Sequence, residues 1–281
     1  MHRRHLFIHI PKTGGTTMGQ ILRRNFGAGF YSYYGLWDTR QFSEEDVAGM
    51  LDLHPQFRCI ASHMFSTRLP FESPTWEVRA FAFIRKPFDR ALSLYFHNVR
   101  MNRENGGSGY AQQIEPFFEK VLRERVDSGF FDFQTRFLTA QEPTASGVQK
   151  ILDLVRSGNL ILAPLERFID ACLVLENVFP DDLRNTAFTK SHMQSPREQA
   201  IPPKLEERLL DCNPHDQQLY EVACSLFEKK TNALFSGPEG LETAKRDFAR
   251  RVDILKKQER NEQLRNQMTS WFGNLVGKVL K

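Results

Sequence analysis

The densest set of phosphate-binding groups in the sequence lies near its start, in residues 9–17. This segment combines a lysine, two glycines and three threonines: Lys12, Thr13, Gly14, Gly15, Thr16 and Thr17. The lysine supplies a mobile cation and the threonines supply hydroxyl donors. The adjacent glycines let the backbone approach a ligand closely. The residue types and their spacing therefore predict an anion site, typically one for phosphate.

The neighbouring residues place this segment between a strand and a helix. Residues 6–10 are a short apolar run typical of a buried strand, and residues 18–26 carry apolar side chains at helical spacing. The first turn of such a helix offers unpaired N–H groups and the positive end of the helix dipole. Because Lys12 precedes both glycines, the pattern differs from a Walker A loop, in which the lysine follows the last glycine.

A histidine is predicted on the same rim of the fold. Residues 57–63 are typical of a second strand, which ends in Ser62 and His63. Ligands of open α/β sheets sit beyond the carboxyl ends of the strands, so His63 is expected near Lys12. An isolated histidine is usually structural or solvated, but this position favours His63 as a candidate for catalysis. Residues 28–57 begin with an aromatic, loop-like stretch that either lines an acceptor cleft or packs, and a helix with Ser43 as its N-cap is expected after it.

A second anion motif follows the next predicted strand, residues 78–84. Arg85 ends that strand, Pro87 suits a first helical turn, and Ser93 falls about two turns into the helix. The fork of an arginine suits a phosphate dianion. Taken alone, a turn with basic residues facing water is the simpler interpretation. However, the two motifs occur in order, about 70 residues apart, which argues against a coincidence.

Both motifs resemble those of one enzyme family. The string Pro-Lys-Thr-Gly-Gly-Thr-Thr resembles the 5′-phosphosulfate loop of sulfotransferases that use 3′-phosphoadenosine 5′-phosphosulfate (PAPS), most of all the branch with the carbohydrate 2-O-sulfotransferases. Residues 84–95 resemble the family's 3′-phosphate motif. Family members carry Gly-His or a similar pair where this chain has Ser62-His63. The resemblance covers roughly residues 5–230, with specific signal only at 10–17, 62–63 and 85–95.

The resemblance implies a reaction and a role for each motif. The sulfuryl group of PAPS would pass in line to an acceptor hydroxyl, and the resemblance implies that this hydroxyl belongs to a carbohydrate. Lys12 and the loop would hold the 5′-phosphosulfate, and Lys12 would stabilise the leaving phosphate. His63 would be the base, and Arg85 with Ser93 would bind the 3′-phosphate. No metal and no nucleic acid is expected. A loop near residues 187–200 would close over the nucleotide, with Lys190, Ser191 and Arg197 as candidates.

The length and the charge of the chain limit how it can be organised. Its 281 residues suffice for one large α/β domain, a parallel sheet with helices on both faces. The net charge is +4, but residues 240–281 hold 10 Lys/Arg and 5 Asp/Glu, so the rest sums to −1. We therefore expect a sulfotransferase domain at 1–235 and a basic amphipathic helical tail at 236–281. The tail would pack on the body or on a second copy, or lie on an anionic membrane surface or polymer.

The cysteines and the lengths of the apolar runs give expectations about the cellular location of the protein. The four cysteines, Cys59, Cys172, Cys212 and Cys224, are neither paired nor clustered, as expected of free thiols. The sequence has no run of 18 apolar residues, so no transmembrane span is expected. The N-terminus enters the first strand almost at once, and a cytoplasmic and bacterial protein is therefore expected. Two other functions stay open: a P-loop-type nucleotide kinase, and a catalytically silent binding protein that acts through its basic tail.

Overall fold

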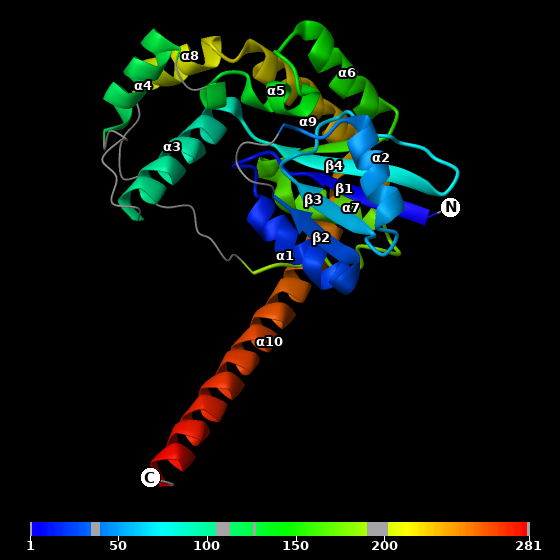
Figure 1. Cartoon of the computed structure of the whole chain (residues 1–281), viewed down its shortest axis with the longest axis vertical. Helices are drawn as coiled ribbons and strands as arrows, with labels where there is room; N and C mark the ends of the chain where they lie inside the picture. The colour runs from blue at the N-terminus through cyan, green and yellow to red at the C-terminus, as the bar shows by residue number, and fades with distance from the viewer. Residues whose placement is uncertain (1, 35–39, 105–112, 126–127, 190–201, 280–281) are drawn as a thin grey trace.

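A parallel sheet forms the centre of the computed structural model, which describes residues 2–34, 40–104, 113–125, 128–189 and 202–279 (Figure 1). The strand order is β2-β3-β1-β4-β5, and every neighbouring pair is parallel. The described strands are β1 (His2–Ile8), β2 (Phe30–Tyr33), β3 (Cys59–Ser62), β4 (Trp76–Ile84) and β5 (Leu160–Pro164). Because all the strands run the same way, their carboxyl ends share one edge of the sheet.

The helices of the described residues follow the strands in chain order. They are α1 (Gly15–Phe26), α2 (Glu44–Leu53), α3 (Pro87–Glu104), α4 (Ile114–Glu124), α5 (Phe133–Thr139), α6 (Ala145–Arg156), α7 (Phe168–Val178), α8 (Pro203–Asp211), α9 (Pro214–Phe235) and α10 (Pro238–Val279). A short 3₁₀ helix, η3 (Leu165–Arg167), joins β5 to α7. None of the described helices is long and apolar enough to cross a membrane.

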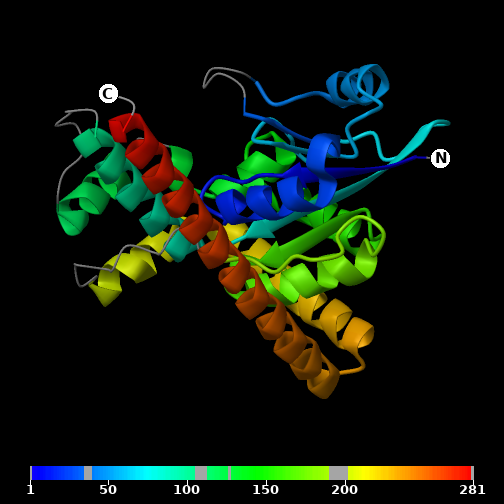
Figure 2. The same cartoon turned by 90° about the horizontal axis from the view of Figure 1, so that it is seen from below.

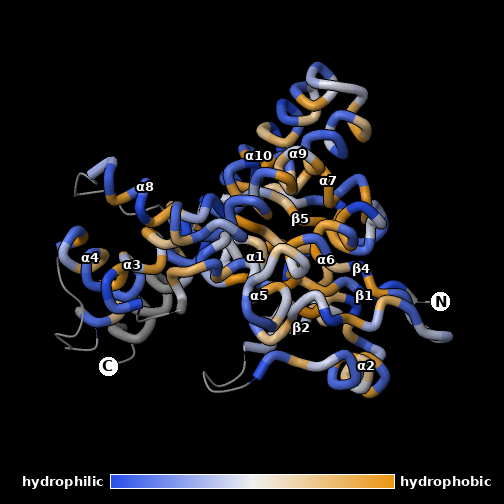
Figure 3. Tube along the Cα trace, turned by 90° about the horizontal axis from the view of Figure 1, so that it is seen from above, coloured by the Kyte–Doolittle hydropathy of each residue, from blue (hydrophilic) through white to orange (hydrophobic). Residues whose placement is uncertain are grey.

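Both faces of the sheet are buried, as the apolar runs of the strands require. In β4, Phe81 and Phe83 point into a core built with α1, α7 and the start of α10. The alternate residues Ala80 and Ala82 point into a second core built with α2, α5 and α6. Helix α9 contributes to both cores, and the hydrophobic colouring of β4 and β5 in Figure 3 marks this interior. The predicted α/β fold with helices on both faces is confirmed.

The two predictions for residues 28–57 have different outcomes. The predicted aromatic loop was wrong at Phe30–Tyr33, which form the edge strand β2 paired in parallel with β3. Bulky aromatic side chains favour a strand, no glycine, proline, asparagine or aspartate interrupts them, and Phe30 is buried against the core of α1. The helix predicted after Ser43 is confirmed. Ser43 Oγ accepts from Asp46 N at 3.2 Å, and Asp46 Oδ2 accepts from Ser43 N at 2.9 Å, which is a capping box.

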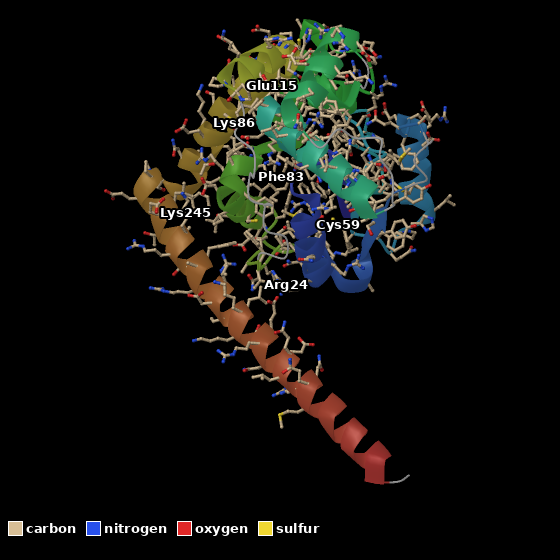
Figure 4. The ribbon with its side chains drawn as sticks, turned by 90° about the vertical axis from the view of Figure 1, so that its left-hand side faces the viewer. Arg24, Cys59, Phe83, Lys86, Glu115 and Lys245 are labelled. Atoms are coloured by element: carbon tan, nitrogen blue, oxygen red, sulfur yellow. The ribbon has the colours of Figure 1, made fainter. Side chains whose placement is uncertain are left out.

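Two parts of the chain extend beyond the sheet. Helices α3, α4 and α8 pack on one another around a third apolar cluster at one side of the body (Figure 2). Helix α10 starts on the body, where Lys245 Nζ lies 3.1 Å from Asp170 Oδ1, and then projects away from it (Figure 4). Leu241 and Phe248 are buried in the core, whereas Met268 is 59% exposed. The first part of the predicted tail therefore packs into the body, and a domain boundary at residue 235 stays a prediction.

The cysteines add no covalent links. All four are free, as predicted, with Cys59 and Cys172 buried. Burial raises the pKa of both of these thiols, so they pack as small apolar groups.

Candidate active site

The loop between β1 and α1 has the backbone of an anion site. Gly14 caps α1 in the left-handed conformation, at φ 84°, and Lys12 is also left-handed, at φ 72°. The first helical hydrogen bond runs from Met18 N to Gly14 O at 3.2 Å. The N–H groups of residues 15–17 therefore have no helical partner. Since α1 has no acidic residue in its first turn, these groups and the helix dipole favour an anion at this point.

The two glycines of the loop are needed because their neighbours leave no room for a side chain. A Cβ on Gly14 would lie 2.6 Å from Leu165 Cδ1, which belongs to η3. A Cβ on Gly15 would lie 1.6 Å from His9 Nε2, inside the imidazole ring. The loop is thus packed against the end of β5 on one side and against the end of β1 on the other.

The three threonines of the loop have different surroundings. Thr13 is fully buried, and its Oγ1 donates to Ile10 O at 2.8 Å. Its hydroxyl proton therefore holds the loop together and does not face a ligand, in contrast to the hydroxyl donor expected from the sequence. Thr16 is exposed and Thr17 is half-buried, so both are accessible beside the helix terminus.

Lys12 is crowded by other cations. Burial is the main cause that lowers its pKa to about 8, and Arg100, Arg85 and Arg90 lower it further. No ion pair of Lys12 with a carboxylate is found in the part of the chain that the structure describes. His97 on α3 belongs to the same neighbourhood, because burial and then Lys12 and Arg100 lower its pKa. A site with this excess of positive charge is suited to a ligand with several negative charges.

Arg85 lies beside Lys12 and is held there by a buried glutamine. Its Nη1 donates to Lys12 O at 3.4 Å, which links the two predicted motifs. Gln134 on α5 is 1% exposed and accepts from Arg85 N at 2.8 Å. The Gln134 Nε2 donates to Arg85 O, also at 2.8 Å. Asp216 on α9 accepts from Gln134 N at 3.0 Å and Thr135 N at 2.7 Å, which fixes the start of α5.

Ser93 lies on α3, and no hydrogen bond of its side chain is found among the residues that the structure describes. It is half-buried, two turns into the helix that Arg85 precedes. The structure thus brings Lys12, Arg85 and the helix of Ser93 together. The predicted nucleotide contacts Lys190, Ser191 and Arg197 lie outside the described residues.

His63 stands at the end of β3 with one tautomer favoured. Its Nδ1 lies 2.5 Å from His9 O, and a carbonyl only accepts, so Nδ1 carries the proton. The Nε2 lone pair is then free to accept a proton. Burial lowers the pKa of His63, and the bond to His9 opposes this only in part. The imidazole is therefore neutral near pH 7, as a general base requires.

A cavity of about 330 Å³ opens beside this histidine. Its lining comes from the anion loop, the outer face of α1, the strand β2 and the ends of β1 and β3: His9, Gly15, Thr16, Gly19, Gln20, Arg23, Phe30, Ser32, Tyr34 and His63. The ring of Tyr34 lies 4.9 Å from that of His63 between centroids. A larger cavity of about 380 Å³ between β2 and α2 is lined by Tyr31 and Tyr33 of the predicted aromatic stretch. It contains none of Lys12, His63, Arg85 and Ser93, so the cavity beside His63 is the candidate acceptor site.

Two residues of the site were missed from the sequence. His9 ended a predicted strand and carried no signal beyond its position before the loop. Gln134 lies among the aromatic residues of 130–138, where neither its type nor its spacing marks it as part of a site. Among the described residues, no group of three or more His, Cys, Asp or Glu side chains is placed to hold a metal ion, and the expected absence of a metal stays a prediction.

Comparison with known proteins identifies the family. A model described as the sulfotransferase family matches residues 2–222. The chain belongs to the sulfotransferase family. A crystal structure of a sulfotransferase from Alicyclobacillus acidocaldarius is 14% identical, covers 85% of this chain and 97% of its own, and superposes with a TM-score of 0.43. No curated protein matches the chain.

Family membership assigns the general activity. As a member, the chain is a transferase of the type that moves sulfuryl groups, and such enzymes as a family use PAPS and a hydroxyl-bearing acceptor. The matched region spans the anion loop, His63, Arg85 and Ser93. It ends within α9, so α10 lies outside it.

Proposed function

We propose that this sulfotransferase transfers the sulfuryl group of PAPS to an acceptor hydroxyl, with His63 as the base. The observation that carries the proposal is the convergence of three strand ends on one rim. Arg85 Nη1 lies 3.4 Å from the carbonyl of Lys12, and His63 Nδ1 lies 2.5 Å from the carbonyl of His9. A cation pair for a nucleotide and a neutral imidazole therefore lie next to the same loop.

The residues present fit PAPS as the co-substrate. When bound, PAPS supplies an activated sulfuryl group. The N–H groups of residues 15–17, which have no partner within α1, and the ammonium of Lys12 would hold the 5′-phosphosulfate. The guanidinium of Arg85 and the hydroxyl of Ser93 would hold the 3′-phosphate. The crowding of cations around Lys12 supports this fit, because their repulsion is relieved by a ligand of several negative charges.

The chemical roles follow from the protonation states. His63 offers the lone pair of Nε2, which takes the proton of the acceptor hydroxyl. Lys12, charged at pH 7, would stabilise the negative charge on the leaving phosphate oxygen. Because the loop and the base are already on one rim, catalysis would rest mainly on positioning and charge stabilisation.

A nucleotide kinase fits these residues less well. A Walker-type site uses the hydroxyl after the lysine and a strand-ending aspartate to hold Mg²⁺. Here the hydroxyl of Thr13 is buried and donates to Ile10 O. The strands β3 and β4 are followed by His63 and Arg85 rather than by aspartate.

We further propose a carbohydrate hydroxyl as the acceptor, in the cavity of about 330 Å³ beside His63. This rests on the resemblance of the loop to that of the carbohydrate 2-O-sulfotransferases, and the ring of Tyr34 offers an apolar face at the cavity wall. A cytoplasmic location, a bacterial source, and association with a membrane or a second copy through α10 stay predictions from the sequence.

A melting panel tests the nucleotide site without knowledge of the acceptor. A ligand that binds only the folded state adds about 2.7 kcal/mol at a hundred times its Kd, which raises Tm by roughly 5–10 °C. We expect this rise with the product nucleotide 3′-phosphoadenosine 5′-phosphate (PAP) and little rise with ADP or ATP. Arg85→Gln should lose the rise, and Lys150→Gln, an exposed control on α6, should keep it. Equal rises with ADP and PAP would refute the 3′-phosphate site.

A further inference from the structure

The two histidines of the site contact one another in two ways. The ring centroids of His9 and His63 lie 4.1 Å apart with 30° between the planes. The carbonyl of His9 also accepts from His63 Nδ1. The side chain and the main chain of one residue therefore both define where the base lies.

His9 in turn is held from behind by the core. Phe7 stacks on it at 5.3 Å between centroids, with 13° between the planes, and Phe81 stacks on Phe7 at 5.0 Å. Tyr34 stands edge-on to His9 at 5.5 Å. A column of rings thus runs from the middle of the sheet to the base, and His9 is its last member before His63.

The same imidazole is seated against the anion loop. A Cβ on Gly15 would fall 1.6 Å from His9 Nε2, so the glycine backbone and the ring are in direct contact. Gly15 is also the first residue of α1, whose N–H is one of the groups proposed to hold the 5′-phosphosulfate. A shift of His9 would therefore disturb the base and the loop together.

The ring of His9 is neutral, which suits a residue that packs against a general base. Its Nδ1 is buried and has no hydrogen-bond partner among the described residues. Burial, followed by His63 and Lys12, lowers the pKa of His9 to about 3, so the ring stays neutral. The charged or titratable groups around the pair are Lys12 from the loop, Tyr34 directly after β2 and Arg23 from α1. When His63 carries a proton, a neutral His9 ring can still pack on it, whereas a protonated His9 would repel it.

We propose that His9 is the positioning residue of the base: its ring packs on that of His63 and links the orientation of the base to the anion loop. The proposal rests on the proposed role of His63. It predicts that the flat ring of residue 9 matters, and its nitrogen atoms do not. The matched pair of variants is therefore His9→Phe, which keeps a flat ring, and His9→Leu, which keeps much of the volume without a ring.

The first readout needs no acceptor. Nitrogen NMR of the histidines, recorded on the full chain from pH 4.5 to 8, reports the tautomer and the pKa of His63. We expect the Nδ1–H tautomer and a pKa below 6.5 in the wild type and in His9→Phe. In His9→Leu we expect a mixture of tautomers and a pKa closer to 6.5, because the ring is freer and more hydrated. Circular dichroism and the PAP-induced rise in Tm verify that each variant folds and keeps its nucleotide site.

The second readout is turnover with any acceptor that the wild type sulfates. We expect His9→Leu to lose kcat on the order of ten- to a hundredfold, as for a misplaced catalytic group, with the KM for PAPS within about threefold of the wild type. His9→Phe should stay within about threefold in kcat. An unchanged His63 tautomer and unchanged kcat in His9→Leu would overturn the proposal, as would equal losses in both variants. A wild type that binds PAP yet sulfates nothing would instead overturn the proposed function.

Discussion

We expect the affinity of this sulfotransferase for PAP to fall steeply above pH 8, because Lys12 loses its proton there. Burial and three arginines, led by Arg100, lower its pKa from 10.5 to about 8. A bound phosphate favours the charged form of a nearby lysine, so the pKa rises again in the complex. The lysine is thus easier to deprotonate in the free protein than in the complex, and its contribution to binding is complete below pH 8 and lost above it.

The size of the effect follows from these two pKa values. With a pKa of about 8, the free lysine is roughly nine-tenths charged at pH 7 and about one-tenth charged at pH 9. If the complex restores the ordinary value of 10.5, the affinity falls about tenfold per pH unit above pH 8. The total loss approaches about 300-fold before the curve levels off. The phosphates of PAP do not contribute, since their second ionisation, near pH 6, is already complete.

Isothermal titration calorimetry of PAP binding between pH 6.5 and 10 measures this curve. Lys12→Arg should bind with a flat curve over the same range, because a guanidinium keeps its charge. Lys150→Arg, a control at an exposed position on α6, should reproduce the wild-type curve. Circular dichroism at each pH verifies that the chain stays folded. A flat wild-type curve, or the same fall in Lys12→Arg, would refute the assignment of this titration to Lys12.

Three further changes test how the site and the chain are held. Gln134→Ala should weaken PAP binding about tenfold in a melting assay and ADP binding much less, because the backbone of Arg85 loses two hydrogen bonds; equal weakening of both nucleotides would speak against this. Gly15→Ala should displace the ring of His9 and lower kcat on the order of a hundredfold, with wild-type turnover as the contrary result. A chain ending at Phe235 should melt roughly 10 °C or more below the full chain, because two buried side chains of α10 leave the core, whereas one ending at residue 261 should match it.

The parts of the site that the sequence predicted are those encoded locally. The apolar run, the glycines and the helical spacing after them specify a strand, a turn and a helix within residues 2–26, and Lys12 is placed by that order alone. Arg85 is placed in the same way by the end of β4. Parallel pairing then brings the strand ends to one edge, which is why the rim could be anticipated from the order of the elements.

The parts that the sequence did not predict depend on contacts between distant residues. His9 and His63 are 54 positions apart, and Gln134 and Arg85 are 49 apart, so no local spacing relates them. Thr13 looked like its neighbours Thr16 and Thr17, yet the fold of the loop turns its hydroxyl inward to Ile10. The side-chain partners of a loop residue are set by the turn geometry, which the residue types alone do not specify.

The most direct test of the account is the transfer of ³⁵S from labelled PAPS to a panel of hydroxyl-bearing acceptors, run in parallel with the wild type and His63→Gln. We expect label in a carbohydrate with the wild type, and a loss on the order of 10²–10⁴-fold in His63→Gln, which removes the base but keeps a polar side chain. The PAP-induced rise in Tm should be the same in both proteins. Equal transfer by the two proteins, with PAP still bound by both, would contradict the role of His63 as the base.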